Sequence, residues 1–212
     1  MKRLAVFTIL LFAAFSSICY AQLVVNGSFE DGYTGNGVGF IPNVSGSTIP
    51  GWTASDVDWI GALWQANAGL NSIDLSGAGK GWIRQTITTL PGTSYVLSFA
   101  LAGNPDGPPD KKQLDVLVNS VSLVGNSLLE FDTKDRSRTN MGWLTFAYGF
   151  TASGSATTIE FASNTGTNYG PAIDSVEVEV TGVVVPTPEP SILYLLAGSL
   201  LGLVVSRRKR GC

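Results

Sequence analysis

Hydrophobic and polar residues alternate with a period of two through most of the middle of the chain. In the run 95–101, Tyr, Leu, Phe and Leu alternate with Val, Ser and Ala. The same alternation recurs at 114–119, 144–150, 159–161 and 176–180, and Gly, Pro, Asn and Ser separate the runs. Because successive side chains of a β-strand point to opposite faces, this period predicts strands with one buried face. The sequence therefore predicts an all-β fold, an antiparallel β-sandwich, and helical periodicity is almost absent.

The first 21 residues have the organisation of a signal peptide. Two basic residues open the chain, an apolar run covers 4–15, and small residues at positions 19 and 21 precede Gln22. A transmembrane helix is the alternative, but the run is well short of the roughly 20 apolar residues that a span needs. We therefore expect export, with cleavage by signal peptidase before Gln22.

The end of the chain, residues 183–212, differs in composition from the rest. It holds a Pro-Glu-Pro motif, an apolar transmembrane segment at 192–206 and a basic end. The motif and the first basic residues are Pro188, Glu189, Pro190, Arg207 and Arg208. Taken alone, this tail reads as a membrane anchor whose basic end stays in the cytoplasm.

The order of these three parts resembles the PEP-CTERM sorting signal of Gram-negative bacteria. The resemblance implies transient anchoring in the inner membrane, recognition by an exosortase and cleavage at the Pro-Glu-Pro motif. It also implies release to the cell surface or the extracellular matrix. A permanently anchored form is the alternative.

The segment between the two ends, residues 22–182, is acidic and contains neither His nor Cys. It has seven basic and fifteen acidic residues, a net charge of −8. Such a charge repels phosphate backbones, so we expect no nucleic-acid partner. The chain has no His, and both Cys lie in the end segments. The absence of His excludes His-dependent nucleophile systems and His-containing zinc and copper sites.

Six short motifs follow one another through this segment. They are VNGSFE at 25–30, IPGW at 49–52, GWIRQT at 81–86, PGTSYVLSF at 91–99, GNP at 103–105 and IDSV at 173–176. The ordered series resembles the choice-of-anchor C family, and it is also similar to plant cell-wall proteins with galactose-binding-like domains. The resemblance implies a jelly-roll sandwich of the galactose-binding type, related in shape to carbohydrate-binding modules. It implies no particular ligand.

A structural calcium site is predicted where the first and last strands meet. Asp174 begins the last predicted strand, and the period of two places it on the face of Val176 and Val178. A carboxylate that enters an apolar layer is costly without a partner. Jelly-roll modules of the resembled type commonly bind Ca²⁺ there, and Glu30, Asp174 and an oxygen near Ser28 are the predicted ligands. The alternative is a strand-end carboxylate bound by backbone N–H groups.

Several tryptophans suggest a site for sugars, whose apolar faces stack on indole rings while charged and polar groups bind the hydroxyls. The predicted site residues are Trp59, Trp64, Trp82, Arg84 and Asp58. Trp82 and Arg84 share parity on one predicted strand, so we expect both to project from its outer face. The alternative is that the tryptophans belong to the core, where this residue type is usually found.

These features predict an exported, non-catalytic surface or matrix protein that binds carbohydrate or has a structural role in the exopolysaccharide. An adhesion protein that acts through protein–protein contacts is the alternative. Asp56 and Asp58 raise a third option, because two carboxylates in a cleft can hydrolyse a glycosidic bond. Nothing else in the sequence indicates a cleft, so we do not expect an enzyme.

Overall fold

The computed structural model describes residues 22–35 and 39–182. The predicted signal peptide and sorting tail lie outside the described residues. The strands are β1 (Phe40–Gly46), β2 (Thr53–Ile60), β3 (Ser72–Asp74), β4 (Trp82–Thr88), β5 (Ser94–Gly103), β6 (Lys111–Val118), β7 (Val121–Ser122), β8 (Leu129–Asp132), β9 (Leu144–Thr151), β10 (Ala156–Ser163) and β11 (Pro171–Gly182). In these described ranges, no helix is long and apolar enough to cross a membrane. The five alternating runs of the sequence coincide with strands, except that Asn119 lies one residue past β6, and this confirms the all-β prediction.

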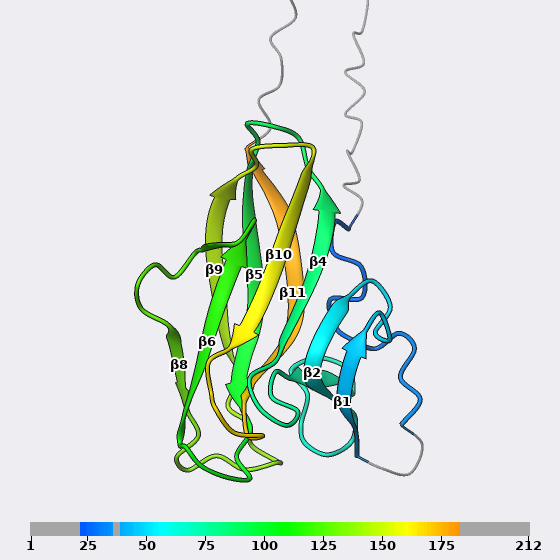
Figure 1. Ribbon diagram of the computed structural model, residues 1–212, viewed down its shortest axis with the longest axis vertical. Coiled ribbons are helices and arrows are strands. Elements are labelled where there is room, and N and C mark those ends of the chain that lie inside the picture. The colour runs from blue at the N-terminus through cyan, green and yellow to red at the C-terminus, as the bar shows by residue number, and fades with distance from the viewer. Residues whose placement is uncertain (1–21, 36–38, 183–212) are drawn as a thin grey trace, which may run out of the picture.

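One antiparallel sheet curls into two layers. Its strand order is β7-β6-β10-β4-β2-β3-β11-β5-β9, with β1 added to β2 and β8 added to β6. Figure 1 shows β6, β10 and β4 lying over β9, β5 and β11, with β2 and β1 at one side of the sandwich. All of the strand pairs are antiparallel.

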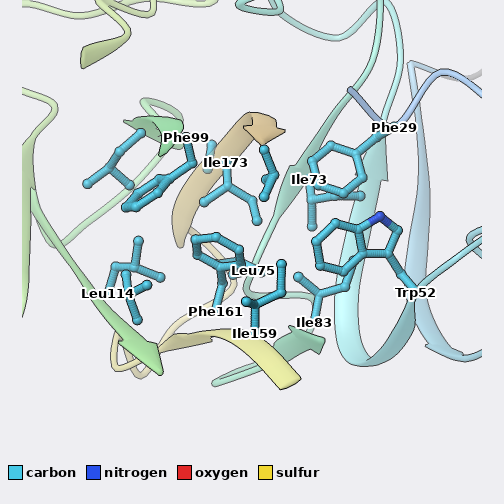
Figure 2. Packing of buried hydrophobic residues seen from close by; sticks show 14 of the residues in the cluster. Phe29, Trp52, Ile73, Leu75, Ile83, Phe99, Leu114, Ile159, Phe161 and Ile173 are labelled. Atoms are coloured by element: carbon cyan, nitrogen blue, oxygen red, sulfur yellow. The ribbon is translucent and has the colours of Figure 1, made fainter. Parts of the chain in front are cut away.

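The core lies between these layers, where the strands turn their apolar positions inward (Figure 2). Leu114 from β6, Ile83 from β4 and Ile159 from β10 are fully buried. Phe99 of β5 meets Phe161 of β10 edge to face, with 4.9 Å between the ring centroids. This contact joins the two layers through the apolar faces that the period of two predicts.

A second part of the core lies under the N-terminal segment, whose described residues 22–35 form no strand. Phe29 is fully buried there and packs against Trp52 with 5.4 Å between ring centroids. The Trp52 indole N–H donates to the Asn26 carbonyl at 3.0 Å. The segment therefore packs beside β4 and β2 and supplies the polar partners that buried indoles need.

Candidate functional site

Two of the predicted sugar-stacking residues are core residues, so that part of the prediction is wrong. Trp59 is 1% exposed and Trp64 is 4% exposed. The Trp59 indole N–H donates to the Phe29 carbonyl at 3.0 Å, and that of Trp64 donates to the Ser72 hydroxyl at 2.9 Å. Tyr33 lies edge-on against Trp59 at 5.3 Å between centroids. Neither ring has a face free for a sugar.

The two aspartates of β2 bind backbone N–H groups of different segments, Asp58 in strand β1 and Asp56 in the loop between β3 and β4. Asp58 is half-buried and accepts the Asn43 N–H at 2.9 Å, and burial raises the pKa of its carboxyl. Asp56 accepts the N–H groups of Ala78 at 2.8 Å and Gly79 at 3.0 Å. Asp58 binds the backbone of β1 and Asp56 that of a loop, so both carboxylates have structural partners, which does not favour an acid–base pair around a glycosidic bond.

Trp82 and Arg84 lie together on the outer face of β4. Their neighbours Ile83 and Gln85 are buried, whereas Trp82 is half-buried and Arg84 is exposed. The Arg84 guanidinium stands 4.6 Å from the centroid of the Trp82 ring. One of its nitrogens is 3.9 Å from a carboxylate oxygen of Glu160 on β10. Stacking and charge together hold the guanidinium over the indole ring.

Cross-strand register brings further polar side chains to the same face, because paired residues on neighbouring strands share a side of the sheet. Ser55 and Thr53 of β2 pair with Trp82 and Arg84, and Glu160 pairs with Arg84 from the other side. Asp115 of β6 lies one strand further on, opposite Ala162, and accepts the Ser122 hydroxyl at 2.6 Å. We call this group the Trp82 face: Thr53, Ser55, Trp82, Arg84, Asp115 and Glu160.

The Trp82 face offers an indole, with the Arg84 guanidinium stacked over it, among side chains that donate and accept hydrogen bonds. Arg84 donates, Asp115 and Glu160 accept, and the hydroxyls of Ser55 and Thr53 do both. Sequence reasoning found Trp82 and Arg84 by their parity but missed the partners from β2, β6 and β10. The partners could have been suspected from their polar character at outward-facing strand positions. The strand pairing that brings them together, however, cannot be predicted from any one segment of the sequence.

The predicted calcium ligands Glu30 and Asp174 bind one loop, residues 67–71. Asp174 accepts the N–H groups of Asn67 at 2.8 Å and Ala68 at 3.0 Å through one oxygen. One oxygen of Glu30 accepts two further N–H groups of the loop, at 2.9 and 2.8 Å. Gly69 has φ +65°, and a Cβ there would stand 2.4 Å from that Glu30 oxygen, so the loop needs glycine to wrap the carboxylate.

The prediction that Asp174 shares the apolar face of Val176 and Val178 is wrong. A register shift in β11 lies between Asp174 and Glu177, and Ser175 has φ 52°. Asp174 consequently pairs with Ala100, on the opposite side of the sheet from Val178. It is nevertheless fully buried, because the loop 67–71 covers it, and this burial raises the pKa of its carboxyl to about 6.

Residues 22–179 match the model of a family described as "Protein of unknown function (DUF642)". The chain belongs to the DUF642 family. This DUF642 domain is also similar to part of halomucin from Haloquadratum walsbyi (strain DSM 16790 / HBSQ001), with 28% identity over 179 residues. That match covers 81% of the chain and 2% of halomucin, so the chain spans a very small part of that relative.

Among solved structures, the DUF642 domain resembles carbohydrate-binding modules in fold. The CBM22-1-CBM22-2 tandem domain of Xyn10C from Paenibacillus barcinonensis superposes with a TM-score of 0.51 and 16% identity. The match covers 82% of this chain and 49% of the tandem. TmCBM61, solved with β-1,4-galactotriose, has a TM-score of 0.49 and 16% identity, covering 76% of this chain and 99% of that one. The fold is thus a curled antiparallel sheet of the carbohydrate-binding-module kind.

The DUF642 domain also buries a carboxyl that the sequence did not single out. Asp74 of β3 has no exposed surface, and it accepts the side-chain amide of Asn104 at 2.8 Å. Its other oxygen accepts the N–H groups of Ser76 at 3.0 Å and Gly170 at 3.1 Å. Burial raises the pKa of Asp74 to about 8 despite these donors. The carboxyl ties three loops at one end of the sandwich to β3.

Proposed function

We propose that this chain is an exported, non-catalytic protein that binds carbohydrate through the Trp82 face. The observation that carries the proposal is the half-buried Trp82 ring with the Arg84 guanidinium 4.6 Å from its centroid, surrounded by polar side chains from three neighbouring strands. Carbohydrate sites combine an aromatic surface with a few convergent hydrogen-bonding groups. The fold shared with the Xyn10C modules supports the same proposal.

The composition of the Trp82 face suits neutral or acidic sugars. The Arg84 side chain is 49% exposed, and its guanidinium presents five N–H donors to hydroxyl or carboxylate oxygens. Glu160 is 27% exposed and contacts the guanidinium from the neighbouring strand β10, while the Arg84 side chain keeps about half of its surface exposed. Because the face lies on a sheet, it favours an extended polysaccharide over a single enclosed sugar.

Replacing Trp82 or Arg84 by Ala should weaken glycan binding at least about tenfold, since each removes one of the two principal contacts of the face. Binding of the purified protein to a glycan array, followed by titration with the best glycan, measures this. Thr88→Ala on the same strand is the matched control, because Thr88 is exposed on the same side beyond the face. A wild-type protein that binds no glycan would contradict the proposal and favour adhesion through protein contacts.

Export and sorting complete the proposed role. We propose that the domain is a jelly roll of the galactose-binding type and a choice-of-anchor C protein. Signal peptidase would remove residues 1–21, and an exosortase would cleave the PEP-CTERM tail at Pro188-Glu189-Pro190. The protein would then lie on the cell surface or in the exopolysaccharide matrix of a Gram-negative bacterium, after a transient stay in the inner membrane.

We also propose a structural Ca²⁺ held by Glu30 and Asp174, with the segment at Ser28 supplying a further oxygen. Carboxylates and carbonyls are the ligands that Ca²⁺ prefers. The described part of the chain has no group of three or more His, Cys, Asp or Glu side chains placed to hold a metal ion. Backbone carbonyls or water would therefore have to supply most of the six to eight ligands, while the loop N–H groups compete for the carboxylates.

Calcium at a hundredfold above its Kd should stabilise the folded protein by about 2.7 kcal/mol, because it binds the native state alone. Chelation should lower Tm by several degrees, since 1 kcal/mol shifts a domain of this size by about 2–4 °C. Asp174→Asn should remove most of this difference. Melting curves of metal-stripped protein that superimpose with and without calcium would leave Asp174 as a carboxylate bound only by N–H groups.

A further inference from the structure

Strand β9 forms an edge of the sheet that carries none of the usual protection. It stands at the end of the strand order, and among the described strands it pairs only with β5, over eight consecutive residue pairs. Its sequence, Leu144–Thr151, has no charged residue and no proline. Native edge strands are normally kept from pairing with other chains by charges, proline, bulges or short length.

The other edge strands of this sheet follow that rule. β1 contains Pro42 and two register shifts against β2. β7 has two residues, and β8 has four, two of them acidic. β9 is the exception, and its open edge leaves backbone N–H and C=O groups available to pair with another strand.

The inward face of β9 carries a row of aromatic side chains that the domain covers only in part. Phe146 and Tyr148 stack against Phe99 of β5, with centroids 5.9 and 6.4 Å away, and Phe150 stacks against Tyr95 at 5.4 Å. The three β9 rings are half-buried, whereas Phe99 and Tyr95 are 1% and 2% exposed. The row stays open on the side away from β5.

The sequence of β9 is nearly the same in both directions. Residues 145–151 read TFAYGFT, and the only mismatch is Ala147 against Gly149. An antiparallel pair of two such strands centred on Tyr148 places Thr145 opposite Thr151 and Phe146 opposite Phe150. Every pair then joins residues of like size and chemistry, and no charges meet although the domain carries a net charge of −8. An interface around a two-fold axis requires this kind of self-complementarity.

We propose that two copies of this chain dimerise by antiparallel pairing of β9 with β9 around Tyr148. The sheet then continues from β5 and β9 of one copy into β9 and β5 of the other. The pairing satisfies the edge N–H and C=O groups of both strands and covers both aromatic rows. Because one strand per copy forms the contact, the dimer is reversible and depends on concentration.

Cysteine cross-linking tests the register directly. Thr145→Cys and Thr151→Cys are made separately in the full-length chain with Cys19→Ser and Cys212→Ser, and kept in non-ionic detergent. Opposite residues have Cβ atoms about 4.5–5.5 Å apart, within reach of a short thiol cross-linker. A mixture of the two variants should give a cross-linked dimer, whereas each variant alone should give little, because identical positions lie far apart along the strands.

Ala147→Lys should abolish the dimer in sedimentation equilibrium, because it places a charge on an exposed edge position without touching the core. Thr88→Lys on β4 is the control with the same charge, and it should leave the dimer intact. No cross-link in the mixture, or a cross-link equally strong for one variant alone, would overturn the proposed pairing. A wild-type protein that stays monomeric at all concentrations would overturn it as well. It would do so even if Ala147→Lys abolished glycan binding.

Discussion

Trp59→Ala should lower the free energy of unfolding by about 3–5 kcal/mol, the usual cost of removing a large aromatic side chain from a core. Trp59 is 1% exposed and fills the space between β2 and the N-terminal segment. The substitution would leave a cavity and remove one of the two donors to the Phe29 carbonyl, the other being the Asn71 side-chain amide. Trp82→Ala should cost no more than about 1 kcal/mol, because the ring lies on the outer face.

Urea unfolding followed by circular dichroism measures both variants, and an unchanged slope with denaturant shows that the midpoints report stability. The two variants act as controls for each other, since each removes an indole from a strand of similar length. Equal losses of stability would mean that Trp82 also belongs to the core. The Trp82 face would then lose its central element, and the sugar proposal would lose its support.

The second large effect is a fall in stability as pH rises from about 5 to about 9, caused by Asp74. Burial raises the pKa of this carboxyl from 3.8 to about 8 in the folded protein. The folded state therefore binds more protons than the unfolded state between these values, and its stability decreases as pH rises through that range. The favourable contribution is complete below the unfolded pKa and is lost as pH passes the folded pKa.

The charged groups around Asp74 act in opposite directions. Asp58, its cross-strand neighbour, raises the pKa of Asp74 further. Lys112 is also buried and donates to the Gly107 carbonyl at 2.7 Å. Burial lowers the pKa of Lys112, while the charge of Asp74 raises it. Ionised Asp74 therefore gains some attraction from Lys112, which limits the loss of stability at high pH.

Asp74→Asn should flatten the pH profile above about pH 6, because an amide has no proton to lose. A fall at lower pH should remain, since the pKa of Asp174 is raised to about 6. Urea unfolding at a series of pH values measures the profile. The control is Asp132→Asn, which removes one negative charge from an exposed position of β8 and should keep the wild-type slope. A wild-type protein as stable at pH 9 as at pH 5 would show that Asp74 ionises without penalty.

The alternation of apolar and polar residues predicts the class of fold and the positions of five of the eleven described strands, β5, β6, β9, β10 and β11. The runs at 95–101 and 144–150 coincide with β5 and β9, because a half-buried strand must alternate apolar and polar residues wherever it lies in the sheet. The same logic placed Trp82 and Arg84 on one outer face of β4. Odd and even positions of a strand face opposite sides of the sheet, and this rule holds as long as the strand has no bulge.

Contacts between distant segments account for what parity along one strand could not predict. Asp56 and Ser175 adopt φ of 52°, and register shifts near them change which side chains face inward. Such bulges depend on the partner strand, so Asp174 lies on the side that the period did not predict. Trp59 and Trp64 are buried because other segments cover them, and Glu160 reaches Arg84 through the pairing of β10 with β4. Burial and register arise from contacts between distant segments, and no single segment of the sequence encodes them.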